Sequence, residues 1–169
     1  MLTDYVVIDL EMTGLNAKTD RILEAGAARV RGNVVTAAFS EIINPKRELS
    51  EKVISLTGIT NEMAVQGKEM DATLMAFLDF IGEDILVGQN VIFDYSFLKQ
   101  WAVNHKRTFE RNAVDTLKLA RKFLPQEQKK DLASLCSYFG IERVHAHRAL
   151  DDVLETQQIF EQLQKMYEA

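Results

Sequence analysis

Four carboxylates and one histidine lie beside apolar, core-forming segments of the chain: Asp9, Glu11, Asp94, His147 and Asp152. A carboxylate next to a core is costly unless something compensates its charge, and divalent metal ions are a usual compensation. Hard oxygen ligands favour Mg²⁺ or Mn²⁺ over a soft metal. These residues therefore predict a metal-dependent phosphodiesterase.

The first pair of acids follows strand geometry. Residues two apart on a strand face the same way, so Asp9 and Glu11 should project together from the end of an apolar strand. Thr13 and Gly14 follow at once and favour a tight turn whose backbone lies close to a ligand. Two surface acids at a strand exit are the alternative interpretation of this pattern.

The last pair follows helix geometry. At about 100° per residue, one apolar stripe of the terminal helix is formed by Ala149, Val153, Thr156, Phe160, Leu163 and Tyr167. Asp152 lies roughly 60° from the centre of that stripe and Asp151 about 160° away. Asp152 is therefore expected at the edge facing the core, and Asp151 is expected to point to water.

These acids suit a site for two metal ions. Two ions about 3.5–4 Å apart can clamp a scissile phosphate and stabilise both the attacking and the leaving oxygen. We expect Asp9 to bridge the ions, Glu11 and Asp152 to supply further ligands, and Asp94 to hold one ion directly or through water. His147 titrates near neutral pH and could deprotonate the attacking water.

The overall composition sets the class of protein. The chain has 169 residues, 47% of them hydrophobic, which suits one domain over 1–169 with a sizeable core. A net charge of −5 argues against a general polyanion binder with a basic surface. We expect no membrane span and no secretion signal. The single cysteine, Cys136, lies among apolar residues and is expected to be a buried thiol in a cytoplasmic protein.

The order of the segments predicts an α/β fold. Strands are expected at 5–11, 21–31, 34–39, 85–87 and 113–114, the second and third forming a hairpin beside the first. Helices are expected at 50–58, 71–81, 115–123, 131–139 and 149–167, with a further one that begins at Asp94. Strands followed by βα alternation indicate a mixed central sheet flanked by helices.

Three segments resemble the exonuclease motifs of the DEDDh 3′–5′ exonuclease superfamily: residues 7–15, 89–94 and 147–152. The third motif, His-x-Ala-x-x-Asp, selects His147 and Asp152, in agreement with the helix geometry. The chain is similar to the epsilon proofreading subunit of bacterial DNA polymerase III and to the exonuclease domain of Gram-positive replicative polymerases. The resemblance implies a ribonuclease-H-like fold and release of nucleoside 5′-monophosphates from single-stranded DNA 3′ ends.

The resemblance also implies a subsite for the terminal nucleotide. Backbone from Met12 through Thr13 to Gly14 would meet this nucleotide, and Leu15 would wedge against the bases. Phe93 would pack near the same end, and Asn90 offers a side-chain amide nearby. Leu15 and Phe93 as core residues, and Asn90 as a turn or capping residue, are the alternatives.

Two departures from the family pattern leave the substrate open. Gln89 stands where many relatives carry histidine. Met12 stands where proofreading exonucleases often have threonine, and the first motif is similar here to that of oligoribonucleases, so RNA is a possible substrate. A catalytically silent nucleic-acid-binding or polymerase-accessory module is a further alternative. Without a long C-terminal extension, a free-standing nuclease is as consistent with the sequence as a partner of a DNA polymerase.

Overall fold

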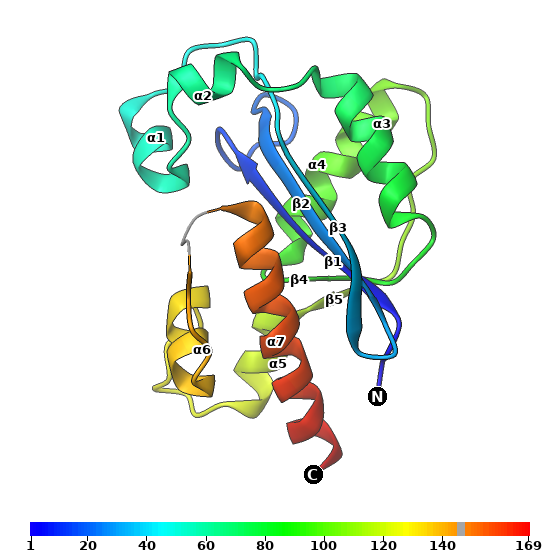
Figure 1. Cartoon of the computed structure of the whole chain (residues 1–169), viewed down its shortest axis with the longest axis vertical. Helices are drawn as coiled ribbons and strands as arrows, with labels where there is room; N and C mark the ends of the chain where they lie inside the picture. Colours follow the sequence, from blue (N-terminus) through cyan, green and yellow to red (C-terminus); the bar gives the residue numbers. More distant parts are fainter. Residues whose placement is uncertain (145–147) are drawn as a thin grey trace.

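The computed structural model describes residues 1–144 and 148–169 and is built around a five-stranded sheet (Figure 1). Its strands are β1 (Tyr5–Met12), β2 (Ile22–Arg31), β3 (Val34–Ile42), β4 (Leu86–Gly88) and β5 (Ala113–Asp115). They lie in the order β3-β2-β1-β4-β5. Strand β2 is antiparallel to both of its neighbours, β1 and β3, whereas β4 runs parallel to β1 and β5 runs parallel to β4. The expected hairpin and the expected mixed sheet are confirmed.

Helices cover both faces of this sheet. They are α1 (Glu51–Thr57), α2 (Asn61–Val65), α3 (Met70–Ile81), α4 (Val91–Asn104), α5 (Thr116–Phe123), α6 (Leu132–Phe139) and α7 (Ala149–Glu168). Helix α7 crosses one face, with α5 and α6 beside it, while α3 and α4 pack on the other face (Figure 1).

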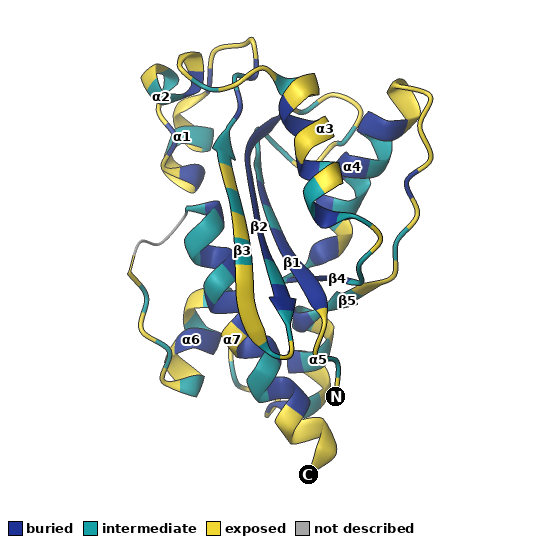
Figure 2. Cartoon of the chain, turned by 45° about the vertical axis from the view of Figure 1, so that its right-hand side comes forward, coloured by how far each residue is buried: buried dark blue, intermediate teal, exposed yellow. Residues whose placement is uncertain are grey.

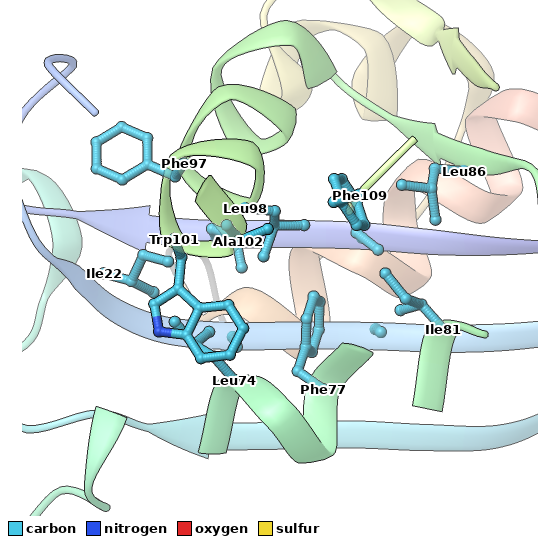
Figure 3. Packing of buried hydrophobic residues seen from close by; sticks show 14 of the residues in the cluster. Ile22, Leu74, Phe77, Ile81, Leu86, Phe97, Leu98, Trp101, Ala102 and Phe109 are labelled. Carbon is cyan, nitrogen blue, oxygen red and sulfur yellow. The ribbon is translucent and has the colours of Figure 1, made fainter. Parts of the chain in front are cut away.

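The two cores are separated by the alternation of side chains along β1. Val6, Ile8 and Leu10 belong to the apolar cluster with α3 and α4. Figure 3 shows buried residues of this cluster, among them Phe77 and Trp101. Tyr5 and Val7 belong instead to the cluster with α7. Because side chains alternate along a strand, residues 9 and 11 continue the Tyr5–Val7 row. The acids of β1 therefore lie on the face covered by α7.

Short-range signals set several helix boundaries as expected. Ser50 caps α1 by accepting a hydrogen bond from the Val53 N–H, and Gly58 ends that helix with a left-handed φ of 71°. Cys136 is buried, with 1% of its surface exposed, as expected. Helix α2 was not predicted, because its five residues are too short to show a helical period.

Two helix expectations need correction. Helix α4 begins at Val91, so Asp94 lies inside its first turn and does not start the helix. Tyr167, expected on the buried stripe of α7, is 69% exposed because the last turn of the helix extends beyond the sheet (Figure 2). In the described ranges 1–144 and 148–169, every helix is too short or too polar to span a membrane.

Candidate active site

Three carboxylates converge where the end of β1 meets the first turn of α7. Asp9, Glu11 and Asp152 each offer an oxygen atom, and these atoms lie within 4.8 Å of one another. Asp152 is 8% exposed, in agreement with its expected place at the edge of the buried stripe, whereas Asp151 is half-buried. Two segments more than 130 residues apart in the sequence therefore meet at one acidic cluster.

A glycine on β2 allows α7 to approach the sheet this closely. Gly26 pairs with Asp9 across the two strands. A Cβ atom built on Gly26 would lie 2.8 Å from the carbonyl carbon of Ala149 and 2.9 Å from its Cβ, too close for ordinary contact. The absent side chain of Gly26 thus makes room for the start of α7, and with it for Asp152. The sequence analysis did not identify this residue.

A buried glutamate fixes the same helix end. Glu24, which is 1% exposed, accepts a hydrogen bond from the Ala149 N–H at 2.5 Å. Its other carboxylate oxygen pairs with the guanidinium of Arg148 at 2.7 Å. Negative charge is favourable at a helix N-terminus, where backbone N–H groups have no partner within the helix. Glu24 was also missed, although an acid inside the apolar stretch that begins at Ile22 is the same kind of signal as Asp9.

The acids of the cluster raise one another's pKa. Burial, followed by the neighbouring charges of Asp94, Glu11 and Asp152, raises the pKa of Asp9 well above its usual range. Burial together with the charges of Asp152 and Glu24 raises the pKa of Glu11 to about 8, against an opposing effect of Arg148. At neutral pH the metal-free cluster therefore holds protons.

Asp94 reaches the cluster from the other face of the sheet. It is 5% exposed, and it lies outside the group of three carboxylates whose oxygens meet within 4.8 Å. Burial and the charge of Glu11 raise its pKa well above the usual range, while a backbone hydrogen bond with Leu10 opposes the shift. Its electrostatic effect on Asp9 is second only to burial. The four predicted carboxylates thus form one electrostatic unit.

The cluster suits hard divalent cations. The Oδ2 atom of Asp9 is buried and has no hydrogen-bond partner among the described residues. A buried carboxylate oxygen without a partner is costly, and a cation among carboxylate oxygens would remove that cost. The predicted donors are all carboxylates, the set that Mg²⁺ and Mn²⁺ prefer.

An arginine borders the cluster on its α7 side. The guanidinium of Arg143 lies 3.1 Å from Asp152 and 2.9 Å from Glu155. Glu155 is 4% exposed and also accepts a hydrogen bond from the Cys136 thiol at 3.7 Å. Arg143 therefore links a member of the acidic cluster to a buried carboxylate one turn further along the helix. His147, the predicted base, lies outside the described residues.

The turn after β1 is closed by an aspartate that the sequence analysis did not identify. The Thr13 hydroxyl donates a hydrogen bond to Asp20 at 3.0 Å, and a Cβ on Gly14 would lie 2.4 Å from that carboxylate. The small size of Gly14 is thus needed by the loop itself. Leu15 is 67% exposed, whereas Met12 is half-buried against the core cluster at a register shift of β1.

The second motif is held from the side of β5. Asn90 has a left-handed φ of 54°, and its N–H donates a hydrogen bond to Asp115 at 2.9 Å. Gln89 bonds to the carbonyl oxygen of Lys130 and accepts from the Thr116 hydroxyl at 2.5 Å. Gln89 thus ties β4 to the helices that follow β5. Phe93, in the first turn of α4, is half-buried.

Sequence comparison places this chain among exonucleases. The pattern of the RNase T exonuclease family matches residues 6–160. The epsilon subunit of DNA polymerase III from Aquifex aeolicus is 37% identical over 157 residues, which cover 92% of this chain and 78% of the subunit. The PolC-type DNA polymerase III from Bacillus subtilis is 38% identical over 157 residues, covering 90% of this chain but only 11% of the polymerase.

Solved exonuclease structures have the same fold. Exonuclease X, in complex with 5′-overhanging duplex DNA, superimposes with a TM-score of 0.77 at 21% identity, over 97% of this chain and 93% of that one. Exonuclease I from E. coli, in complex with a dA16 oligonucleotide, gives a TM-score of 0.81 at 18% identity, over 99% and 42%. The ribonuclease-H-like arrangement implied by the motifs is confirmed.

Proposed function

The chain belongs to the DEDDh 3′–5′ exonuclease family of phosphodiester hydrolases, and from that premise we propose that it degrades single-stranded DNA from the 3′ end. It releases nucleoside 5′-monophosphates one at a time. The observation that best supports this proposal is the meeting of oxygen atoms from Asp9, Glu11 and Asp152 within 4.8 Å. This cluster lies at the end of β1, the strand that carries the first family motif.

Each acid has a defined task in the proposed reaction. Asp9, Glu11 and Asp152 would hold two Mg²⁺ or Mn²⁺ ions, with Asp94 completing the set. When bound, the two ions stabilise charge on the attacking and leaving oxygens of the phosphodiester. His147 takes the proton from the attacking water onto a ring nitrogen, a task that suits a group titrating near neutral pH.

The terminal nucleotide would lie between the turn after β1 and the start of α4. Leu15 is 67% exposed, as a side chain that wedges between bases must be. Asn90 and Phe93 lie at the start of α4 and would orient the sugar and the base. The backbone from Met12 to Gly14 would approach the nucleotide closely.

RNA is the second candidate substrate. Met12 within the first motif is similar to oligoribonucleases, whereas the sequence relatives reported above are parts of DNA polymerases. Tolerance or exclusion of the 2′-hydroxyl decides between them. By analogy with the epsilon subunit, we also propose a DNA polymerase as a partner, which co-elution of the purified proteins would test.

A time course on 5′-labelled DNA and RNA strands of equal sequence, with Mg²⁺ or Mn²⁺ supplied separately, tests the proposal. We expect a metal-dependent ladder that shortens from the 3′ end, faster on DNA. Asp152→Asn should abolish it, because the substitution removes a ligand oxygen charge while keeping the shape of the side chain. Asp151→Asn, one residue away, is the matched control and should retain the ladder. If neither the DNA nor the RNA gives a metal-dependent ladder, the protein is instead a silent binding module.

A further inference from the structure

A groove outside the acidic cluster starts at the proposed terminal-nucleotide subsite. It has a volume of about 810 Å³, within the range of about 300–1,000 Å³ that holds small ligands. One wall is the loop 15–18, and the other wall is the outer face of α4. Leu15 and Ile92, which are 67% and 60% exposed, line the groove from its two walls, and Ile92 lies two residues before Asp94.

The outer face of α4 follows a helical period. Its members in the groove are Ile92, Tyr95, Ser96, Lys99, Gln100 and Val103. The opposite face of the helix is buried and carries Asp94. Val103 is 57% exposed although it is apolar, as is Ile92. The helix thus presents Asp94 to the acidic cluster on one side and an uncovered, largely apolar stripe on the other.

The groove continues into a second hollow that carries positive charge. This hollow, of about 270 Å³, shares Ala17, Lys18 and Gln100 with the groove. It is also lined by the exposed side chains of Arg21 and Arg47 and by two carboxylates, Asp20 and Asp71, which accept hydrogen bonds from Thr13 and Trp101. Lys99 is engaged by Glu110, so the cations that face this path are chiefly Lys18 and the two arginines. These three cations outnumber the two carboxylates of the hollow, in a chain whose net charge is −5.

We propose that this path holds the single strand upstream of the nucleotide being removed, an inference that rests on the proposed function. The bases lie against the apolar side chains between the loop 15–18 and α4, and the phosphates face Lys18, Arg21 and Arg47. Proteins that bind single strands without reading sequence combine such surfaces for bases with positive charge along the backbone. The groove includes Leu15, so a strand whose terminal nucleotide lies against Leu15 would continue into it, which favours a strand over a protein helix as the occupant.

Oligonucleotide binding can be measured apart from catalysis. Fluorescence anisotropy of a short 5′-labelled DNA strand in EDTA gives a dissociation constant without hydrolysis. Val103→Asp should weaken binding by roughly tenfold, through charge repulsion and loss of apolar surface. Val65→Asp is the matched control, since Val65 is a 71% exposed valine at the end of α2, outside the groove. Its dissociation constant should equal that of the wild type.

The salt dependence of binding tests the charged part of the path. Each phosphate contact on a single strand contributes about 0.7 to the slope of log affinity against log salt concentration. Lys18→Gln should therefore reduce the slope by about 0.7, and Lys52→Gln on α1 should leave it unchanged. The proposal would be overturned if the two valine variants had equal dissociation constants and Lys18→Gln had an unchanged slope. The apolar face of α4 would then be expected to bind a protein partner.

A small substrate separates this inference from the proposed function. The p-nitrophenyl ester of thymidine 5′-monophosphate carries a scissile phosphodiester but no upstream strand. Val103→Asp and Lys18→Gln should hydrolyse it with wild-type kcat and KM, while KM for the long strand rises. If the wild type cleaves neither the ester nor the strand, the proposed function is wrong. The anisotropy measurements still decide whether the groove binds a strand.

Discussion

Gly26→Ala should inactivate the site without touching any acid. The added Cβ would lie 2.8 Å from the carbonyl carbon of Ala149, whereas carbon atoms in contact are about 3.5–4.0 Å apart. The start of α7 must therefore move away by roughly 0.7–1.2 Å, and Asp152 moves with it. A misplacement of about 1 Å can cost roughly 100-fold in rate. Overpacking adds a cost of about 1–3 kcal/mol in the free energy of unfolding.

Two measurements on this variant distinguish displacement from instability. We expect kcat on a labelled strand to fall by roughly 100-fold, and calorimetric Mg²⁺ affinity to fall as well. Ile81→Val, a buried site on the opposite face of the sheet, should cost about 0.5–1.5 kcal/mol in stability yet retain activity. Wild-type kcat and metal affinity in folded Gly26→Ala would refute the argument that this glycine sets the position of Asp152.

Three further predictions concern charged groups. Metal binding at pH 7 should release protons, because the pKa of Glu11 in the metal-free site is raised to about 8. The affinity for Mg²⁺ should therefore rise with pH up to that value. Calorimetric heats of binding that do not depend on the buffer would contradict this prediction. Arg143→Gln should lower the free energy of unfolding by about 3–5 kcal/mol, because it leaves the buried Glu155 carboxylate without its ion-pair partner. In urea denaturation, adding Glu155→Gln should recover most of this loss, and purely additive effects of the two substitutions would be inconsistent with the pair. Both ring nitrogens of His105 face acceptors, a backbone carbonyl at 2.8 Å and Asp71 at 3.1 Å, which raises its pKa. NMR titration should show that rise and its reduction in Asp71→Asn; the stabilisation from this contact is present at low pH and is lost as pH rises through the raised pKa.

Much of the cluster could be predicted from local periods in the sequence. The two-residue period of a strand put Asp9 and Glu11 on one side, and the structure places them within 4.8 Å of a common partner. The helical period singled out Asp152 over its neighbour, and it is 8% exposed. Periods are readable because each depends only on residues that are adjacent along one element.

The residues that bring those elements together could not be predicted in this way. Glu24 contacts Arg148 and Ala149 across 124 and 125 residues of sequence, and Gly26 contacts the same helix turn. Nothing local to β2 specifies which part of α7 will cross it. The same reason explains the error over Tyr167, since the helical period continues past the point where the sheet ends.

Pairing, more than burial, distinguishes the structural acids of this fold from those of the site. Glu24 and Glu155 are among its most buried carboxylates, and each contacts an arginine that fixes one turn of α7. Burial, followed by the charges of the carboxylates around it, raises the pKa of Asp9. An acid whose buried neighbours are acids has unfavourable electrostatics until a cation arrives, so such a group is expected to bind one. Asp152 belongs to both sets, because it faces the cluster and also contacts Arg143. The first turn of α7 therefore both fixes the helix against the sheet and supplies Asp152 to the acidic cluster.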